Sequence, residues 1–117
     1  PDLAAAVARE AGVITPEFEM KWGATEPARG RPRYGAPDAL VAFAQRHRMG
    51  VRGHTPVWYR NMPNWALAAI ESDGEALLRE RVSGPLSHYR GRVAEWDVVN
   101  EPLEPDHGRS DYLRKSP

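Results

Sequence analysis

Three short apolar segments, at 13–15, 51–54 and 93–99, alternate with stretches of helical pattern, and this alternation constrains the fold more than any other feature. The first segment reads Val-Ile-Thr and is predicted to be a short buried strand. Strands that alternate with helices pair in parallel through right-handed helical crossovers. The sequence therefore predicts an α/β fold with a parallel sheet.

Two helices are predicted around the first two strands. The first begins with Asp2 as its cap, is rich in alanine and should end with Gly12 in the left-handed conformation. The second begins near Pro37 and keeps an apolar face up to 49–50. The region 16–35 between them is rich in proline and glycine and is predicted to be a long loop, a kind of segment that often carries function.

A third helical region precedes the last strand. It is predicted in two parts, 65–70 and 77–82, separated by the Ser-Asp-Gly turn at 72–74. Pro85 should break or kink the helix, because its ring removes a donor and collides with the preceding turn. A further helix is predicted to open within 110–115.

Three parallel strands form neither a closed barrel nor a well-covered open sheet, because two edges stay unpaired. We therefore expect residues 1–117 to be one domain that is part of a larger barrel. The chain begins with Pro1 and carries no targeting signal or membrane-spanning run, so the sequence leaves its location open.

Composition argues against several partners. The 16 basic and 16 acidic residues balance, which implies neither nucleic acid nor an anionic membrane as a partner. Cysteine is absent, which excludes disulfides and thiolate metal sites without fixing the compartment. His47, His88 and His107 have no metal-ligand spacing, so we expect them at the surface and expect neither a metal nor another cofactor.

Each predicted strand ends in a cluster of polar and aromatic residues, at 15–22, 52–58 and 97–101. In an α/β barrel the carboxyl ends of the strands converge on one mouth, where active sites are built. Carboxylate, amide, imidazole and ammonium groups can hydrogen-bond sugar hydroxyls, and indole rings stack on the apolar faces of sugars. The clusters therefore predict a carbohydrate site.

In the same order and at the same spacing, the clusters are similar to the family-ten glycoside hydrolase signatures TPENEMKW, RGHTLVWH and WDVVNE. The resemblance runs through nearly the whole chain. It implies a (β/α)8 TIM barrel, of which this chain would hold strands two to four with their helices. It also implies an endo-1,4-beta-xylanase that hydrolyses xylan with retention, and a secreted or periplasmic location.

The resemblance assigns roles to residues that match the signatures. Glu101 matches the catalytic acid/base, and Asn100 matches the residue that binds the sugar 2-hydroxyl. The remaining matches are expected to bind xylan or a xylo-oligosaccharide through hydroxyl contacts or aromatic stacking: Glu17, Lys21, Trp22, His54, Trp58 and Asn61. The family's nucleophile lies on strand seven in a Thr-Glu-Leu-Asp-like segment, which belongs to a C-terminal half of the barrel that these residues do not include.

Three positions depart from the family pattern. Phe18 replaces a sugar-binding asparagine, which should remove one hydrogen bond to the more distant sugar. Tyr59 replaces a histidine, and Asn61 replaces a glutamine and shortens that polar arm by one methylene. These changes bear on efficiency more than on identity.

Structural roles compete with the catalytic ones. Outside its motif, Glu101 would more often be a helix cap, and His54 a hydrogen-bonded core residue. Trp65 and Trp96 are expected to pack in the core, Glu19 and Arg52 to form an ion pair, and Asp97 to support its neighbours: these are structural predictions.

Two other functions remain open. One is a related Asn-Glu glycosidase that acts on a glucan or galactan, although the Glu-Met-Lys-Trp cluster disfavours it. The other is an inactive half-barrel that at most binds xylan or a related polysaccharide, which the missing nucleophile favours.

Overall fold

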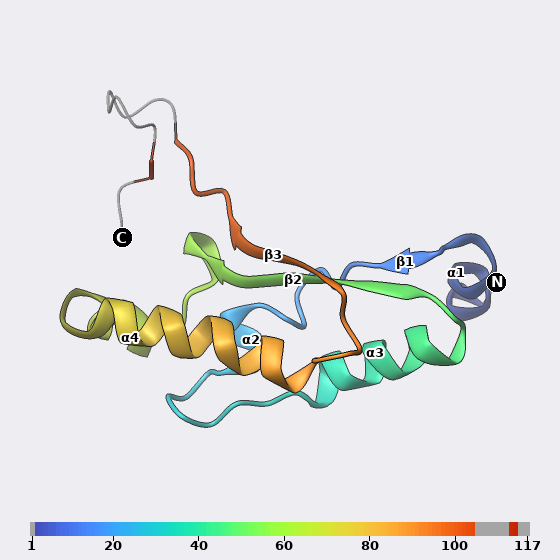
Figure 1. Cartoon of the computed structure of the whole chain (residues 1–117), viewed down its shortest axis with the longest axis horizontal. Helices are drawn as coiled ribbons and strands as arrows, with labels where there is room; N and C mark the ends of the chain where they lie inside the picture. Colours follow the sequence, from blue (N-terminus) through green and yellow to red (C-terminus); the bar gives the residue numbers. More distant parts are fainter. Residues whose placement is uncertain (1, 105–112, 115–117) are drawn as a thin grey trace.

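The computed structural model of the protein describes residues 2–104 and 113–114. Helices and strands alternate along the chain (Figure 1). The elements are α1 (Leu3–Glu10), β1 (Val13–Ile14), α2 (Trp22–Thr25), α3 (Gly35–Arg46), β2 (Gly50–Trp58), the 3₁₀ turn η1 (Tyr59–Asn61), α4 (Asn64–His88) and β3 (Glu95–Asn100). The predicted helix at 110–115 lies mostly outside the described residues.

The three strands form one parallel sheet in the order β1-β2-β3. In Figure 1, α3 and α4 lie along the same side of β2. Strand β2 is central and pairs with β3 from Arg52 opposite Glu95 to Trp58 opposite Asn100. The arrangement confirms the predicted α/β fold as part of a barrel.

Two clusters of buried side chains hold the helices to the sheet. The first joins α3, β2 and the segment before β3, and consists of Met20, Val41, Ala44, Met49, Val51, Tyr89 and Val93. The second is formed by residues of α2 and α4 and consists of Trp22, Ala66 and Leu77. Trp96 packs against the first cluster and Trp65 against the second, so both predicted core tryptophans are confirmed.

The first helix begins as predicted and ends differently. The carboxylate of Asp2 accepts hydrogen bonds from the backbone N–H groups of Ala4 and Ala5, which confirms the cap. Ala11 is already extended, with φ −106°, so the chain runs straight into β1 and needs no left-handed Gly12. Val13 is 58% exposed, so the prediction of a buried strand is wrong there.

The α4 helix confirms one predicted interruption and removes the other. Asp73 has non-helical angles, φ −121° and ψ 15°, where the turn was predicted. Pro85 does not end the helix, which continues to His88 with Tyr89 N–H donating to the Pro85 carbonyl. Buried Leu77 and Arg81 hold the preceding turns in place, so tertiary packing offsets the proline's local penalty.

The ends of α3 and β2 also differ from the sequence pattern. Helix α3 ends when Arg48 adopts the left-handed conformation, with φ 58°, and Met49 N–H returns to the Ala44 carbonyl. Strand β2 continues through Trp58, beyond the predicted 51–54. Pro56 is tolerated because the β2–β3 register shifts between His54 and Val57, where a ladder donor is not needed.

Candidate active site

The carboxyl ends of β2 and β3 bring the two central site residues into direct contact. Trp58 is the last residue of β2, and it pairs with Asn100, the last residue of β3. The next residue, Glu101, has a left-handed backbone with φ 52°. Its Oε2 accepts a hydrogen bond of 2.9 Å from Trp58 Nε1. The indole thus fixes one carboxylate oxygen of Glu101.

The loop after β1 delivers a cation to the same place. Lys21 is the residue that precedes α2, and it is buried to 7% exposure. Its Nζ lies 5.2 Å from the centroid of the Trp58 ring, within reach of a cation–π interaction. Three segments that are distant in sequence therefore meet at Lys21, Trp58 and Glu101, as the strand-end clusters predicted. Glu17 lies earlier in the same loop and is exposed.

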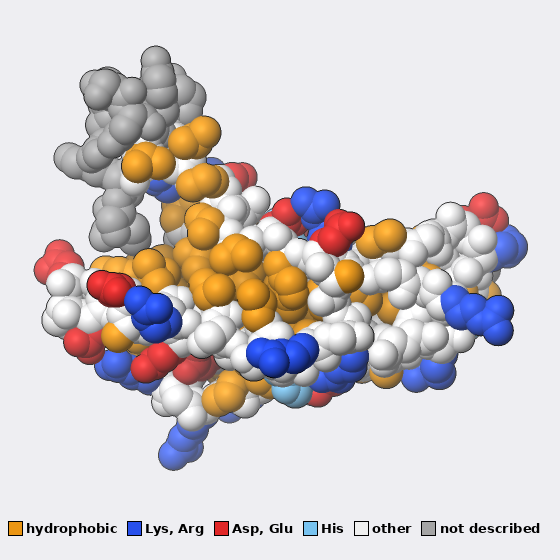
Figure 2. Space-filling view, viewed as in Figure 1, with side chains coloured by type: hydrophobic (Ala, Val, Ile, Leu, Met, Phe, Trp, Pro, Cys, Tyr) orange, Lys and Arg blue, Asp and Glu red, His pale blue; other side chains and the backbone are white. Residues whose placement is uncertain are grey.

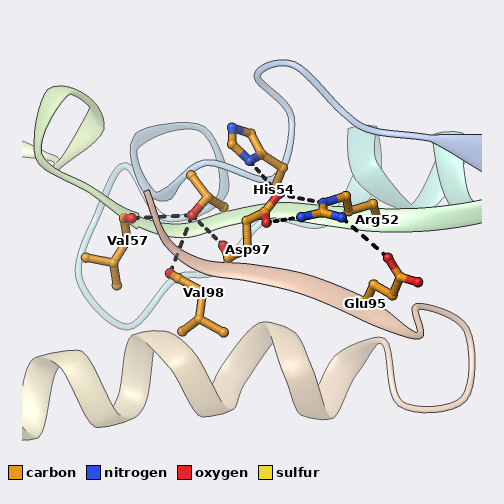
Figure 3. A network of polar contacts seen from close by, with 7 residues as sticks. Arg52, His54, Val57, Glu95, Asp97 and Val98 are labelled. Carbon is orange, nitrogen blue, oxygen red and sulfur yellow. Dashed lines mark hydrogen bonds and ion pairs between the residues drawn. The ribbon is translucent and has the colours of Figure 1, made fainter. Parts of the chain in front are cut away.

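A polar network on β2 and β3 supports His54 (Figure 3). Arg52 donates two hydrogen bonds to the Asp97 carboxylate, of 2.9 Å from Nε and 2.6 Å from Nη2. These bonds, helped by a contact with His54, lower the pKa of Asp97 to about 2. Asp97 Oδ2, which accepts from Arg52 Nε, also lies 3.2 Å from His54 Nδ1. Because the Asp97 carboxylate is ionised at neutral pH, it accepts in this contact and His54 Nδ1 is the donor.

The same network corrects one prediction. Arg52 pairs with Asp97 and Glu95 across the two strands, not with Glu19. The Glu19 carboxylate instead accepts from the Phe18 backbone N–H. Asp97 does support its neighbours, as predicted, because it binds Arg52 and orients the imidazole of His54.

Trp22 is not a sugar platform in this structure. Its side chain is 1% exposed and belongs to the second core cluster. Its Nε1 donates to Glu26 Oε2 at 3.2 Å, and its ring meets Trp65 edge-on at 5.8 Å. The prediction failed because the short helix α2, absent from the sequence-based assignment, turns this ring toward α4.

Asn61 has a structural partner that the sequence did not indicate. Its Oδ1 accepts a hydrogen bond of 2.9 Å from Gly23 N–H in the first turn of α2. This bond satisfies an otherwise unpaired helix N–H and ties η1 to the Lys21 loop. The predicted contact of Asn61 with the sugar is not tested by this bond and stays a prediction.

A pocket of about 310 Å³ opens beside Glu101. Its wall is mostly apolar, and Figure 2 shows hydrophobic side chains gathered over β3 and α4 on this face. Arg114 closes one side: its guanidinium lies 3.7 Å from the Tyr59 ring centroid, and its Nε donates to the Glu101 carbonyl at 3.1 Å. Arg114 lies beyond the three motifs and is not among the predicted site residues.

His88 is a second departure from expectation. Its Nε2 lies 2.8 Å from Asp38 Oδ1, and its ring stacks on Tyr34 at 4.1 Å, so it joins α4 to α3 and is only partly exposed. His47 is exposed, as predicted, and His107 lies outside the described residues.

In the described part of the chain, no three His, Asp or Glu side chains are grouped to hold a metal ion. The described helices include none that is long and apolar enough to span a membrane.

Fold and site together define a segment of an α/β barrel whose carboxylate, indole, imidazole and ammonium groups gather at the carboxyl ends of parallel strands. Comparison with known proteins gives the family. Residues 2–117 match the model of Glycosyl hydrolase family 10. The chain belongs to this family.

Curated relatives and solved structures agree. The chain is 40% identical over 107 residues to "Endo-1,4-beta-xylanase 2" of Claviceps purpurea, covering 91% of this chain and 33% of that protein. It is 38% identical over 104 residues to "Beta-1,4-xylanase" of Dictyoglomus thermophilum, covering 89% and 29%. Xylanase 10B of Thermotoga petrophila, solved with xylobiose, superposes with a TM-score of 0.84 at 34% identity, over 97% of this chain and 34% of that one. The chain thus spans about a third of these relatives.

Proposed function

We propose that the protein belongs to an endo-1,4-beta-xylanase in which Glu101 is the acid/base of a retaining hydrolysis. The observation that carries this proposal is the hydrogen bond from the Trp58 indole to the Glu101 carboxylate, with the Lys21 ammonium over the Trp58 ring, in a chain of glycosyl hydrolase family 10. The named relatives are xylanases, and one related structure contains xylobiose, which supports xylan or a xylo-oligosaccharide as the ligand.

In the proposed mechanism, Glu101 first protonates the oxygen that leaves with the departing sugar. A second carboxylate, roughly 5 Å away in retaining enzymes, forms the covalent glycosyl intermediate. Glu101 then accepts a proton from the water that hydrolyses this intermediate. The hydrogen bond from Trp58 holds Oε2, so Oε1 is the oxygen that would face the glycosidic oxygen.

The neighbouring groups would hold the sugar. The Trp58 ring offers an apolar surface, and the Lys21 ammonium beside it can donate to ring hydroxyls. His54 Nε2 would contact a hydroxyl, because Nδ1 is engaged with Asp97. Asn100, at the end of β3, would bind the 2-hydroxyl, a contact that strengthens in the transition state.

A second candidate is sugar binding without turnover. The 117 residues contain no Thr-Glu-Leu-Asp-like segment, so they supply the acid/base and not the family's nucleophile. Alone, they would bind a xylo-oligosaccharide at Trp58 and Lys21 and release no product. A secreted or periplasmic location fits either function, since polymeric xylan is too large to enter a cell.

Turnover is tested in a chimera in which residues 2–117 replace the matching segment of the Claviceps purpurea relative. The chimera should release reducing sugar from xylan, and Glu101→Gln should lower kcat by about 10²-fold or more, the usual loss for a general acid/base. Glu75→Gln, the same change at an exposed carboxylate of α4, is the matched control. A chimera that folds and binds xylotriose but remains inactive would support the second candidate.

A further inference from the structure

Arg81 is a buried cation in the second half of α4. Its side chain is 3% exposed, and its three donor nitrogens reach three separate segments of the chain. Nε donates to the Pro56 carbonyl at 2.7 Å, Nη1 to Thr25 Oγ1 at 2.7 Å, and Nη2 to the Met20 carbonyl at 2.9 Å. The guanidinium carbon also lies 5.6 Å from the Trp22 ring centroid. No single lysine or apolar side chain could make this set of bonds.

Burial of this charge is unfavourable, which sets Arg81 apart from ordinary core residues. Desolvation lowers the pKa of Arg81 to about 10, so the guanidinium remains charged at neutral pH. The three acceptors are uncharged oxygens, and a well-packed apolar residue would avoid the desolvation entirely. The guanidinium instead orients its three acceptors, because its planar group of N–H donors fixes the directions of the hydrogen bonds.

The three acceptors lie next to the residues of the candidate active site. Met20 directly precedes Lys21, and the Thr25 hydroxyl that accepts from Arg81 donates in turn to the Lys21 carbonyl at 3.0 Å. Pro56 lies two residues before Trp58 on the same strand. Arg81 therefore binds the Met20 carbonyl directly and reaches the Lys21 carbonyl through the Thr25 hydroxyl. It also binds the backbone of β2 two residues before Trp58.

We propose that Arg81 is a positioning residue that fixes the Lys21 ammonium against the Trp58 ring and, through the Trp58 hydrogen bond, orients the Glu101 carboxylate. The expected effect of Arg81 on sugar binding rests on the proposed function. The positioning itself is a property of the ligand-free protein. Helix α4 thereby controls the spacing of Lys21, Trp58 and Glu101, although none of its side chains takes part in the contacts between them.

The test compares Arg81→Lys with Arg79→Lys in the 117-residue chain. Arg79 lies on the same helix, is 75% exposed at its side chain and pairs only with Glu75 among the described residues, so it is a matched control. In ¹H–¹⁵N spectra, Arg81→Lys should shift the Trp58 indole N–H resonance, and Arg79→Lys should leave it in place. The dissociation constant for xylotriose should rise roughly tenfold for Arg81→Lys alone, since misplacement by a fraction of an ångström weakens a preorganised site.

A second variant covers the case in which Arg81→Lys does not fold. Thr25→Val keeps the shape of that side chain and removes the link from Arg81 to the Lys21 carbonyl, so it should move the Trp58 resonance in the same direction. Measurements are made well below each variant's thermal midpoint. The inference is overturned if these variants lower the midpoint and leave the Trp58 resonance at its wild-type position. If the wild type binds no xylotriose, the proposed function fails, and the ligand-free resonance still decides the role of Arg81.

Discussion

Replacement of Gly53 by alanine should break the contact on which the β2–β3 register depends. Gly53 pairs with Trp96 across the sheet, and the indole lies directly over it. An added Cβ would stand 2.2 Å from Trp96 Cε3 and 2.5 Å from Cδ2 and Cζ3, far inside the normal carbon–carbon separation of about 3.5 Å. The ring cannot easily yield, because it packs against the first core cluster and lies 6.0 Å from the Tyr89 ring.

The expected loss can be worked out from these contacts. Overpacking a filled core costs about 1–3 kcal/mol, and the smaller conformational freedom of alanine in the unfolded chain returns about 0.4–1 kcal/mol. The free energy of unfolding should therefore fall by roughly 1–2 kcal/mol, measured by urea denaturation. Gly50→Ala is the control on the same strand, since its nearest new contact is Val13 Cγ2 at an ordinary 3.5 Å, and it should be neutral or slightly stabilising.

A double-mutant cycle identifies the cause. In a Trp96→Leu background the ring is gone, so Gly53→Ala should lose most of its destabilising effect, giving a coupling free energy of about 1–2 kcal/mol. An equal loss of stability in both backgrounds would refute the steric argument. Because Gly53 and Trp96 directly precede His54 and Asp97, the single variant should also weaken the His54–Asp97 contact.

Three further predictions concern the supports of the site. The bonds from Arg52 lower the pKa of Asp97 to about 2 in the folded chain, below the value of about 3.9 in an unfolded chain. The contribution of Asp97 to the free energy of unfolding should therefore be complete above roughly pH 5 and disappear toward pH 2. Asp97→Asn should flatten this part of a profile of stability against pH. Leu77→Ala, at 2% exposure, should lower the free energy of unfolding by about 2–5 kcal/mol, against well under half of that for Leu67→Ala at 38% exposure, both by urea titration. Asn61→Ala removes the cap of α2 and should lower thermal stability by about 1 kcal/mol, whereas Asn61→Asp should retain it.

The sequence predicts the meeting of Lys21, Trp58 and Glu101 because parallel strands with helical crossovers have only one edge at which their carboxyl ends can gather. That inference needs strand order and direction, and both follow from the alternation of patterns. It does not need side-chain orientation, and this is where prediction fails. Trp22 directly follows Lys21, and a four-residue helix without a periodic apolar pattern decides that the indole is buried while the ammonium reaches the Trp58 ring.

Pro85 shows the opposite error, in which a strong local rule yields to packing. Its missing N–H should interrupt α4, yet the helix keeps its angles there, and the non-helical residue is Asp73, twelve positions earlier in the chain by numbering. The predicted interruption at 72–74 is confirmed, and the one predicted at Pro85 is wrong. The sequence cannot say which one the core tolerates, because Leu77 and Arg81 become anchors only when α2 and the end of β2 are folded against them.

One face of α4 contributes both to the stability of the fold and to the geometry of the site. Leu77 and Arg81 are four residues apart, so they project from the same side of the helix, one above the other. Leu77 belongs with Trp22 to the second core cluster. The Arg81 guanidinium carbon lies 5.6 Å from the centroid of the same Trp22 ring, and its Nη2 binds the Met20 carbonyl next to Lys21. A cavity at Leu77 would let this face move, and the guanidinium would move with it. The loss of stability predicted for Leu77→Ala should therefore come with a shift of the Trp58 indole resonance, because a displaced Arg81 carries the Lys21 loop away from the ring that holds Glu101. Leu67→Ala, at an exposed position of the same helix, should not produce this shift.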